Sequence, residues 1–346
     1  MNEEQLLIYN KLISKYNFDV FQKDEIELGI KSGVDVTIYA IPEFDWLQMI
    51  EIRKGLENNI EVSAYSKIKF NSWQMREIRK GLKNNVDVSI YSNPEFNNMQ
   101  MEQIRLGLER CLDVSVYIKP EYNWKQMAEI NLGLEVGLDV SIYSNPEFTW
   151  EQMKQILEGL VKNLDVSIYA KPEYSWEQMI QIRWGLEQDL DVNLYANPDF
   201  NEFQMDEIRT GLKNGIEVSW YSNPEFTHWK MRKIIEGLKQ NLDVSWYSKP
   251  EFNEHQMFQI KLGLESKIDV SIYSTIEFSG YQMEEIRIGL EDKIDVSIYA
   301  DTEFHWRQMR EIRLGLKNNI DVTTYLNPNI DYEEMQRIRL ELESNK

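Results

Sequence analysis

Apolar residues recur along this chain with the spacing of a helix, interrupted by a shorter apolar phrase. Residues 42–60 read PEFDWLQMIEIRKGLENNI, in which apolar residues stand at steps of three, four and four, at Met49, Ile52, Leu56 and Ile60. That spacing places them on one stripe of an α-helix. Asp45 can cap the first turn, as can the Asn, Ser or Thr at its place in other copies. We therefore predict a helix from about Asp45 to Asn58.

The shorter phrase, LDVSIYA at residues 164–170, fits two structures. As a strand, its alternate apolar residues share one face, and a strand-plus-helix unit of this length resembles a leucine-rich-repeat horseshoe. As a short helix, Asp165 caps the first turn, and Val166, Tyr169 and Ala170 lie on the buried side.

Two observations favour the helix for this phrase. The position between Ser and Tyr ranges from Ala64 to Trp220, which is too variable for an interior strand and natural for a partly exposed site. The residue before the valine is Asp or Glu in every copy, as helix N-termini favour. We keep the α/β leucine-rich-repeat-like solenoid as the alternative.

Both patterns repeat with a fixed period of 26 residues, marked by tyrosines at 39, 65, 91, 117, 143, 169, 195, 221, 247, 273, 299 and 325. Such phase-locking is the signature of a solenoid, in which each copy packs mainly on its neighbours. We predict an all-α, elongated α-solenoid of about twelve 26-residue helix-turn-helix repeats, forming a single repeat domain over 1–346.

The ends of the repeat array depart from the pattern. Residues 1–40 read as a degenerate N-terminal cap because Lys23 replaces the recurrent methionine, and 41–326 hold the regular repeats. Residues 327–346 read as a C-terminal capping helix, in which Glu341 replaces the recurrent glycine. That glycine, Gly55 in the first regular copy, costs a helix about 1 kcal/mol, so we expect a neighbouring helix to approach closely there.

The strings QMxxIRxGL and DVSxYAxPEF, which recur over residues 18–346, resemble tandem repeats in uncharacterised proteins of low-GC bacteria, their phages and conjugative elements. The resemblance implies a helical short segment and a mobile-element setting near antirestriction genes. It implies no particular activity.

The charge balance is acidic, with 38 Lys and Arg against 58 Asp and Glu and a formal net charge of −20. Such a surface repels nucleic acid and anionic membranes and favours basic partners. The single cysteine, Cys111, forms no internal disulfide, and we see neither a signal sequence nor an apolar run of membrane-spanning length. We expect a cytoplasmic protein.

Candidate chemistry is sparse. His228, His255 and His305 fall in three different copies, where the copies vary most, so we interpret them as surface residues. Cys111 has no histidine at an activating spacing, and no zinc, phosphate-loop or hydrolase motif is present. We predict no enzymatic activity, no cofactor and no metal site.

Two rows of carboxylates recur. We interpret the first as structural helix caps, at Asp87, Asp113, Asp139, Asp165, Asp191, Asp243, Asp269 and Asp295. The second follows the proline, and we take it as a candidate partner-binding row at Glu95, Glu121, Glu147, Glu173, Glu225 and Glu251. Calcium rungs are the weaker alternative, because the phrase offers one carboxylate where calcium needs six or more oxygens.

The acid rows do not match the charge density of DNA. A stack of helical repeats gives about one charge per 10 Å in each row, against about one per 1.7 Å in B-DNA. We also expect a recurrent arginine, such as Arg79 or Arg105, to pair with acids and present a mixed face.

Tryptophans complete the candidate partner-binding set, at Trp46, Trp124, Trp150, Trp176, Trp220, Trp246 and Trp306. They either shield the seam between repeats or serve as anchors for a protein partner, since Trp is enriched in binding hot spots.

These observations lead to a functional hypothesis. We expect a non-enzymatic acidic repeat protein that binds a basic, nucleic-acid-handling protein, such as a nuclease or defence effector. It would act as a phage or mobile-element inhibitor of the anti-restriction or anti-CRISPR type. The alternative is a general protein-protein interaction scaffold. We expect no direct nucleic-acid or membrane contact, and the sequence leaves the oligomeric state open.

Overall fold

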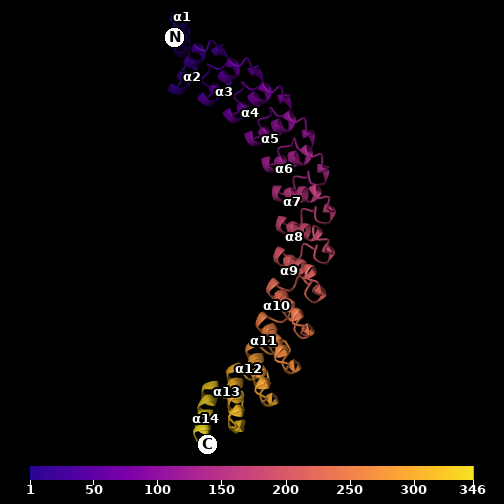
Figure 1. Ribbon diagram of the computed structural model, residues 1–346. Helices are drawn as coiled ribbons and strands as arrows, with labels where there is room; N and C mark the ends of the chain where they lie inside the picture. Colours follow the sequence, from indigo (N-terminus) through magenta and orange to yellow (C-terminus); the bar gives the residue numbers. More distant parts are fainter. Residues whose placement is uncertain (346) are drawn as a thin grey trace. The chain divides into compact units, whose positions relative to one another are not determined.

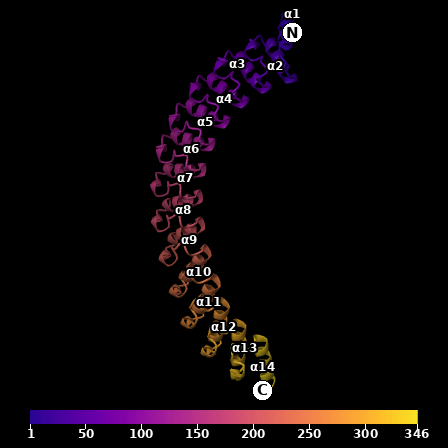
Figure 2. The same ribbon diagram turned by 180° about the vertical axis from the view of Figure 1, so that it is seen from behind.

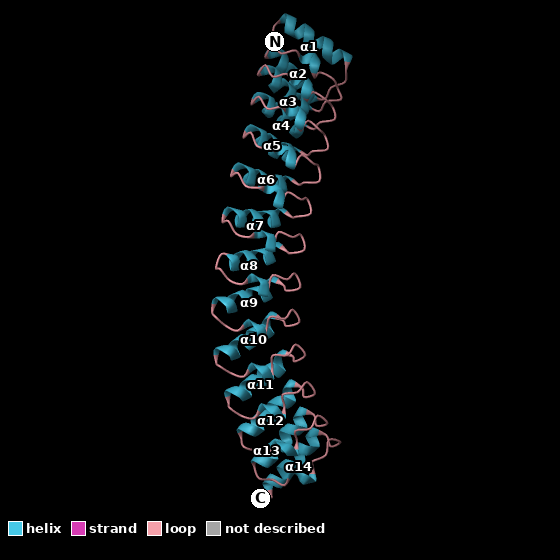
Figure 3. Cartoon of the chain, turned by 90° about the vertical axis from the view of Figure 1, so that its right-hand side faces the viewer, coloured by secondary structure: helices cyan, strands magenta, loops and turns pink. Residues whose placement is uncertain are grey.

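The computed structural model describes residues 1–345, which form fourteen α-helices and twelve short 3₁₀-helices and contain no strand (Figure 3). Contacts divide the chain into two compact units, Met1–Pro172 and a second that begins at Glu173. From α2 (Val20–Lys31) onward, long α-helices alternate with 3₁₀-helices in both units. The predicted α-solenoid of helical repeats is confirmed, and the leucine-rich-repeat-like alternative is wrong.

The first unit contains α1 (Glu3–Lys15), α2 (Val20–Lys31), η1 (Val36–Ile38), α3 (Trp46–Glu57), η2 (Val62–Ala64), α4 (Ser72–Lys83), η3 (Val88–Ile90), α5 (Asn98–Glu109), η4 (Val114–Val116), α6 (Trp124–Glu135), η5 (Val140–Ile142), α7 (Trp150–Val161) and η6 (Val166–Ile168). The second contains α8 (Trp176–Leu186), η7 (Val192–Leu194), α9 (Glu202–Lys213), η8 (Val218–Trp220), α10 (His228–Lys239), η9 (Val244–Trp246), α11 (Glu254–Glu265), η10 (Val270–Ile272), α12 (Gly280–Glu291), η11 (Val296–Ile298), α13 (Trp306–Lys317), η12 (Val322–Thr324) and α14 (Tyr332–Ser344).

Each unit has two layers, which the opposite views of Figures 1 and 2 show. The long helices lie side by side in chain order, and each packs on the next within its unit. The 3₁₀-helices and the loops around them form the other layer, because each returns the chain from the end of one long helix to the start of the next.

The long helices begin and end where the sequence predicts. The Asp45 side chain accepts a hydrogen bond from the Gln48 backbone, and the Gln48 side chain accepts one from the Asp45 backbone, which forms a capping box. The helix ends at its C-cap residue, Asn58, and Asn59 adopts a left-handed conformation with a φ of 54°. Cys111 takes the same position, with a φ of 58°.

The core of each unit lies between the two layers. The long helix contributes a fully buried Met and Ile, as at Met49 and Ile52. The short segment contributes Val62 and Tyr65. The aromatic residue before the next helix, here Phe70, closes the repeat. The predicted stripe extends too far, because Ile60 follows the end of the helix at Glu57, and Leu56 and Ile60 are only half-buried.

The recurrent glycine makes room for a tyrosine side chain. The close approach of a neighbouring helix that we expected there is not the reason for the glycine. A Cβ atom on Gly55 would lie 1.8 Å from the hydroxyl oxygen of Tyr65. That hydroxyl donates a hydrogen bond to the backbone carbonyl of Glu51, at 3.2 Å. The tyrosine of each repeat therefore folds back beneath its own helix, and only glycine leaves room for it.

Within each unit, a recurrent glutamine joins one repeat to the next, and the sequence reasoning gave it no role. Gln74 Nε2 donates to the carbonyl oxygens of Pro94 at 3.2 Å and Phe96 at 2.7 Å, both in the following repeat. In α10, Lys230 replaces the glutamine, and its Nζ donates to the carbonyl of Pro250 at 2.7 Å. The row thus satisfies backbone carbonyls at each junction.

The N-terminal region contains a helix that the repeat pattern did not predict. Helix α1 packs on α2, and Gln5 Nε2 donates to the carbonyl of Ile30 at 3.0 Å. At the other end, Glu341 stands where α2 to α13 carry glycine, and in residues 1–345 no further repeat tyrosine follows it.

Candidate protein-binding surface

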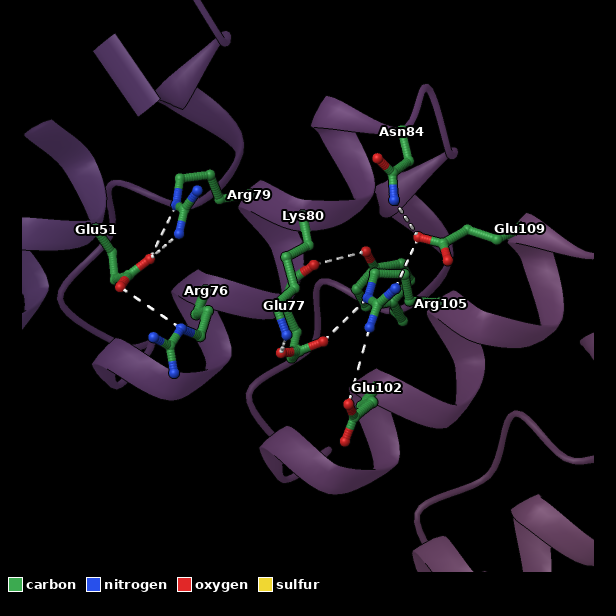
Figure 4. A network of polar contacts seen from close by, with 10 residues as sticks. Glu51, Arg76, Glu77, Arg79, Lys80, Asn84, Glu102, Arg105 and Glu109 are labelled. Carbon is green, nitrogen blue, oxygen red and sulfur yellow. Dashed lines mark hydrogen bonds and ion pairs between the residues drawn. The ribbon is translucent and has the colours of Figure 1, made fainter. Parts of the chain in front are cut away.

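The recurrent arginines lie in the long-helix layer and bind the preceding repeat. Arg79 Nη2 lies 2.7 Å from Glu51 Oε2, and Arg105 Nε lies 3.0 Å from Glu77 Oε2 (Figure 4). Arg105 Nη1 also binds Glu109 of its own helix, at 2.7 Å. The side chains of Arg105 and Glu77 are only 8% and 7% exposed. The expected pairing is therefore present, but the paired side chains are buried or half-buried between repeats and do not form the expected mixed face.

The same arrangement recurs in the second unit. Arg313 Nε lies 2.8 Å from Glu285 Oε2, and Arg339 Nε lies 2.8 Å from Glu311 Oε2. Because these cations are held in contacts between repeats, they do little to offset carboxylates on the other layer.

The charged row is interrupted over α6 and α7, where Asn131 and then Leu157 stand at arginine positions. Leu157 stands opposite Glu129 of the preceding helix. Burial raises the pKa of Glu129, opposed by the charge of Lys154. Beside them, Leu132, Val136 and Val161 are exposed. An open hollow of about 590 Å³ lies among these residues.

The first carboxylate row lies in the layer of short segments, where each acid is the N-cap of a 3₁₀-helix. Asp87 Oδ1 accepts hydrogen bonds from Ser89 Oγ at 2.6 Å and from the Ser89 backbone N–H at 3.0 Å. These bonds lower the pKa of Asp87, so the exposed side chain stays ionised. The same backbone bond is made by Asp113, Asp139, Asp165, Asp191, Asp243, Asp269 and Asp295.

The second carboxylate row lies in the loop that leads to the next long helix. All six predicted members are exposed: Glu95, Glu121, Glu147, Glu173, Glu225 and Glu251. Asn93 Nδ2 donates to Glu95 Oε2 at 3.1 Å, and Asn145 contacts Glu147 in the same way at 3.2 Å. Within residues 1–345, none of the six forms an ion pair.

Five of the predicted tryptophans, Trp46, Trp124, Trp150, Trp176 and Trp306, occupy the first position of a long helix. Several rest on neighbouring groups. Trp46 lies 5.4 Å from the ring of Phe21, and Lys125 Nζ lies 4.4 Å from the centre of Trp150. The ring of Trp306 stacks on that of Tyr281, with their centres 5.4 Å apart, and the guanidinium carbon of Arg307 lies 5.2 Å from the centre of the Trp306 ring.

Trp220 and Trp246 lie elsewhere, at the last residue of η8 and η9. They are 41% and 36% exposed. In the part of the chain that the structure describes, neither ring has an aromatic or cationic partner. The structure therefore separates the predicted tryptophans into two rows, one on each layer.

Sequence reasoning missed that the Trp220 position forms an apolar row within each unit. Every short segment except the last carries an apolar residue there, and Leu194, Ile272, Ile38, Ile90 and Ile142 are all exposed. The available signal was that this position varies in size but stays apolar through eleven copies.

The described residues contain no group of three or more His, Cys, Asp or Glu side chains arranged to hold a metal ion. His228, His255 and His305 lie at the starts of three different long helices. No helix within residues 1–345 is long and apolar enough to cross a membrane. The chain matches no protein-family model, no curated protein and no solved structure.

Proposed function

We propose that this chain is a non-enzymatic acidic repeat protein that binds a basic protein partner. The contrast between its two layers supports the proposal. Arginines on the long-helix layer are held by acids of the preceding repeat, as in the pair of Arg105 with Glu77. Carboxylates on the short-segment layer, such as Glu95, are exposed and form no ion pair among the described residues.

A basic protein suits this surface better than nucleic acid does. Uncompensated carboxylates repel phosphates and attract Lys and Arg, and such attraction speeds association and selects partners by charge. A basic partner that itself handles nucleic acid is the more specific form of the proposal. An inhibitor of host defence of the anti-restriction or anti-CRISPR type rests on the sign of the charge and on the resemblance of the repeats. A general interaction scaffold is the alternative.

The test begins with capture of partners from a native host by the full chain, followed by mass spectrometry. Binding of a recovered protein is then measured as salt rises from about 50 mM to about 500 mM. We expect basic, nucleic-acid-handling proteins whose affinity falls tenfold or more, because salt screens exposed charges. Recovery only of acidic or metabolic proteins would overturn the proposal, and binding that is insensitive to salt would favour the scaffold.

A charge-matched pair of variants locates the surface. The first neutralises four members of the second carboxylate row: Glu95→Gln, Glu121→Gln, Glu147→Gln and Glu225→Gln. The control neutralises four acids outside that row: Glu3→Gln, Glu4→Gln, Glu254→Gln and Glu333→Gln. Each variant removes four negative charges, so the two change the net charge equally. All eight side chains are exposed, so neither variant disturbs the core. We expect the first to weaken binding more than the control, and equal effects would contradict a role for this row.

A further inference from the structure

The apolar row of the short segments is best developed in the second unit. Four successive members are more than a third exposed: Leu194, Trp220, Trp246 and Ile272, at 42%, 41%, 36% and 38%. Hydrogen bonds hold neighbouring members side by side. Ser222 Oγ donates to the carbonyl of Leu194 at 3.0 Å, Ser248 Oγ donates to that of Trp220, and Ser274 Oγ donates to that of Trp246 at 2.8 Å.

Carboxylates border this row on both sides along the chain. On each segment the apolar residue follows the capping acid by three positions and precedes the second acid by five. Across the segments 191–199, 217–225 and 243–251, the exposed acids are Asp191, Asp199, Glu217, Glu225, Asp243 and Glu251. These segments contain one cation, Lys249, whose Nζ lies 5.6 Å from the ring centre of Phe252.

We infer that the short-segment face around Trp220 and Trp246 docks a cationic amphipathic α-helix of a protein partner. This inference rests on the proposed function and names the surface and the chemistry of the bound segment. Two adjacent exposed indoles without partners in the described chain supply apolar anchors. The bordering acids select a segment that carries Lys or Arg beside its apolar residues, and the exposed part of each indole ring attracts cations as well.

The spacing of the repeats favours a helical occupant. Stacked helical repeats lie roughly 8 to 10 Å apart, so Trp220 and Trp246, one repeat apart, present anchors at about that interval. An α-helix rises about 1.5 Å per residue, so residues seven apart are about 10.5 Å apart on the same face. Apolar residues at heptad spacing on the partner's helix therefore contact successive short segments of this chain. Lys and Arg residues beside them on the partner's helix reach the bordering acids.

Three labelled peptides of about 20 residues serve as probes of the full chain. The first contains Leu and Lys with Leu at heptad spacing, the second has the same composition in scrambled order, and the third carries Ser in place of Leu. Fluorescence anisotropy gives the affinity of each. We expect the heptad peptide to bind at least about tenfold more tightly than the other two, since only it combines charge with a matching apolar stripe. Equal affinity for all three would overturn the inference.

A double variant tests the site. Trp220→Ala with Trp246→Ala should weaken binding of the heptad peptide roughly tenfold or more and leave binding of the Ser peptide unchanged. The control is Trp229→Ala in the same unit. It is 52% exposed but lies in the first turn of α10. Circular dichroism checks that all variants keep their helices. No loss in the double variant, or the same loss in the control, would refute the site.

The outcomes separate this inference from the proposed function. If the Ser peptide binds in a salt-sensitive way but the tryptophans have no effect, the proposed function stands and the docking site is wrong. If no cationic peptide binds, both are wrong. Self-association of the chain that the double variant abolishes would show that a second copy occupies this face, which also overturns the inference.

Discussion

Two stretches of the first unit contain the same succession of 12-residue α-helices and 3₁₀-helices and carry different chemistry on the same row. Between α3 and α5, Glu51 pairs with Arg79 and Glu77 with Arg105 (Figure 4). At the next copy, Asn131 takes the arginine position, and its Nδ2 donates to the backbone carbonyl of Gln103 at 3.0 Å. At the copy after that, the position holds Leu157.

The comparison shows which contacts specify the fold. Gly81 and Gly133 lie in the charged and the uncharged stretch, yet a Cβ on either would lie 2.0 Å from the tyrosine hydroxyl of its own repeat. The charged pairs are thus replaceable, whereas the glycine-tyrosine contact is kept. The fold depends on the steric fit of the tyrosine beneath each long helix. The side chains at the arginine positions vary between copies without changing the fold.

The largest expected effect is a loss of stability from Gly81→Ala or Gly133→Ala. The new methyl group displaces a buried tyrosine, which costs about 1–3 kcal/mol, and removes its hydrogen bond, which costs about 1 kcal/mol more. Alanine returns about 1 kcal/mol of helix propensity. We expect a net loss of about 2 kcal/mol in both stretches, measured by urea unfolding.

A double-mutant cycle checks the cause of that loss. Tyr91→Phe removes the hydroxyl that the new methyl group would meet, so its combination with Gly81→Ala should cost less than the sum of the two single changes. A neutral Gly81→Ala, or strict additivity in the cycle, would contradict the steric explanation.

A smaller effect is expected from Arg105→Met, which makes the charged stretch resemble the one that contains Leu157. Glu77 then loses a buried partner but keeps Lys80 Nζ at 2.6 Å. We expect a loss of about 1–2 kcal/mol, below the usual cost of leaving a buried charge alone. Adding Glu77→Gln to Arg105→Met should restore most of the lost stability. If Arg105→Met alone is as stable as the parent protein, the ion pair of Arg105 with Glu77 contributes nothing.

The smallest effect is expected from Glu129→Gln in the uncharged stretch. Burial raises the pKa of Glu129 in the folded protein, so the folded state binds the proton more tightly than the unfolded state does. Ionisation therefore destabilises the fold progressively as pH rises above the ordinary Glu range. Glutamine should be more stable than glutamate by no more than about 0.5 kcal/mol near pH 7, because the carboxyl is only half-buried.

The pH dependence is the check on this prediction. Thermal unfolding at about pH 4 and about pH 7 should show the advantage of Glu129→Gln only at the higher pH. An advantage that grows toward acid would mean that the carboxylate form of Glu129 is stabilised in the fold.

Much of the fold could be predicted because it depends on local chemistry. Asp45 and Asn58 flank the long helix as residue type and spacing indicate, and the acid before each valine identified the short helix. The role of Gly55 could not be predicted, because its cause is a tyrosine ten residues away that folds back in three dimensions.

The candidate surface was predictable in part. Exposure of the second carboxylate row follows from its place between proline and the helix cap. The separation of Trp220 from Trp306 into different layers depends on how the short segment is oriented, which residue identity does not reveal. The burial of Arg105 was also missed, because sequence shows that a cation recurs but not that it faces the preceding repeat.

The hydrogen bonds between repeats allow the number of repeats to change during evolution. Gln74 reaches carbonyls 20 and 22 residues ahead, and Arg79 reaches an acid 28 residues behind. Each bond therefore involves only adjacent copies, and removal or duplication of one whole copy brings the corresponding positions of two other copies together in the same register. Unequal recombination within the gene can lengthen or shorten the protein while it still folds, and each event places different outward side chains next to one another.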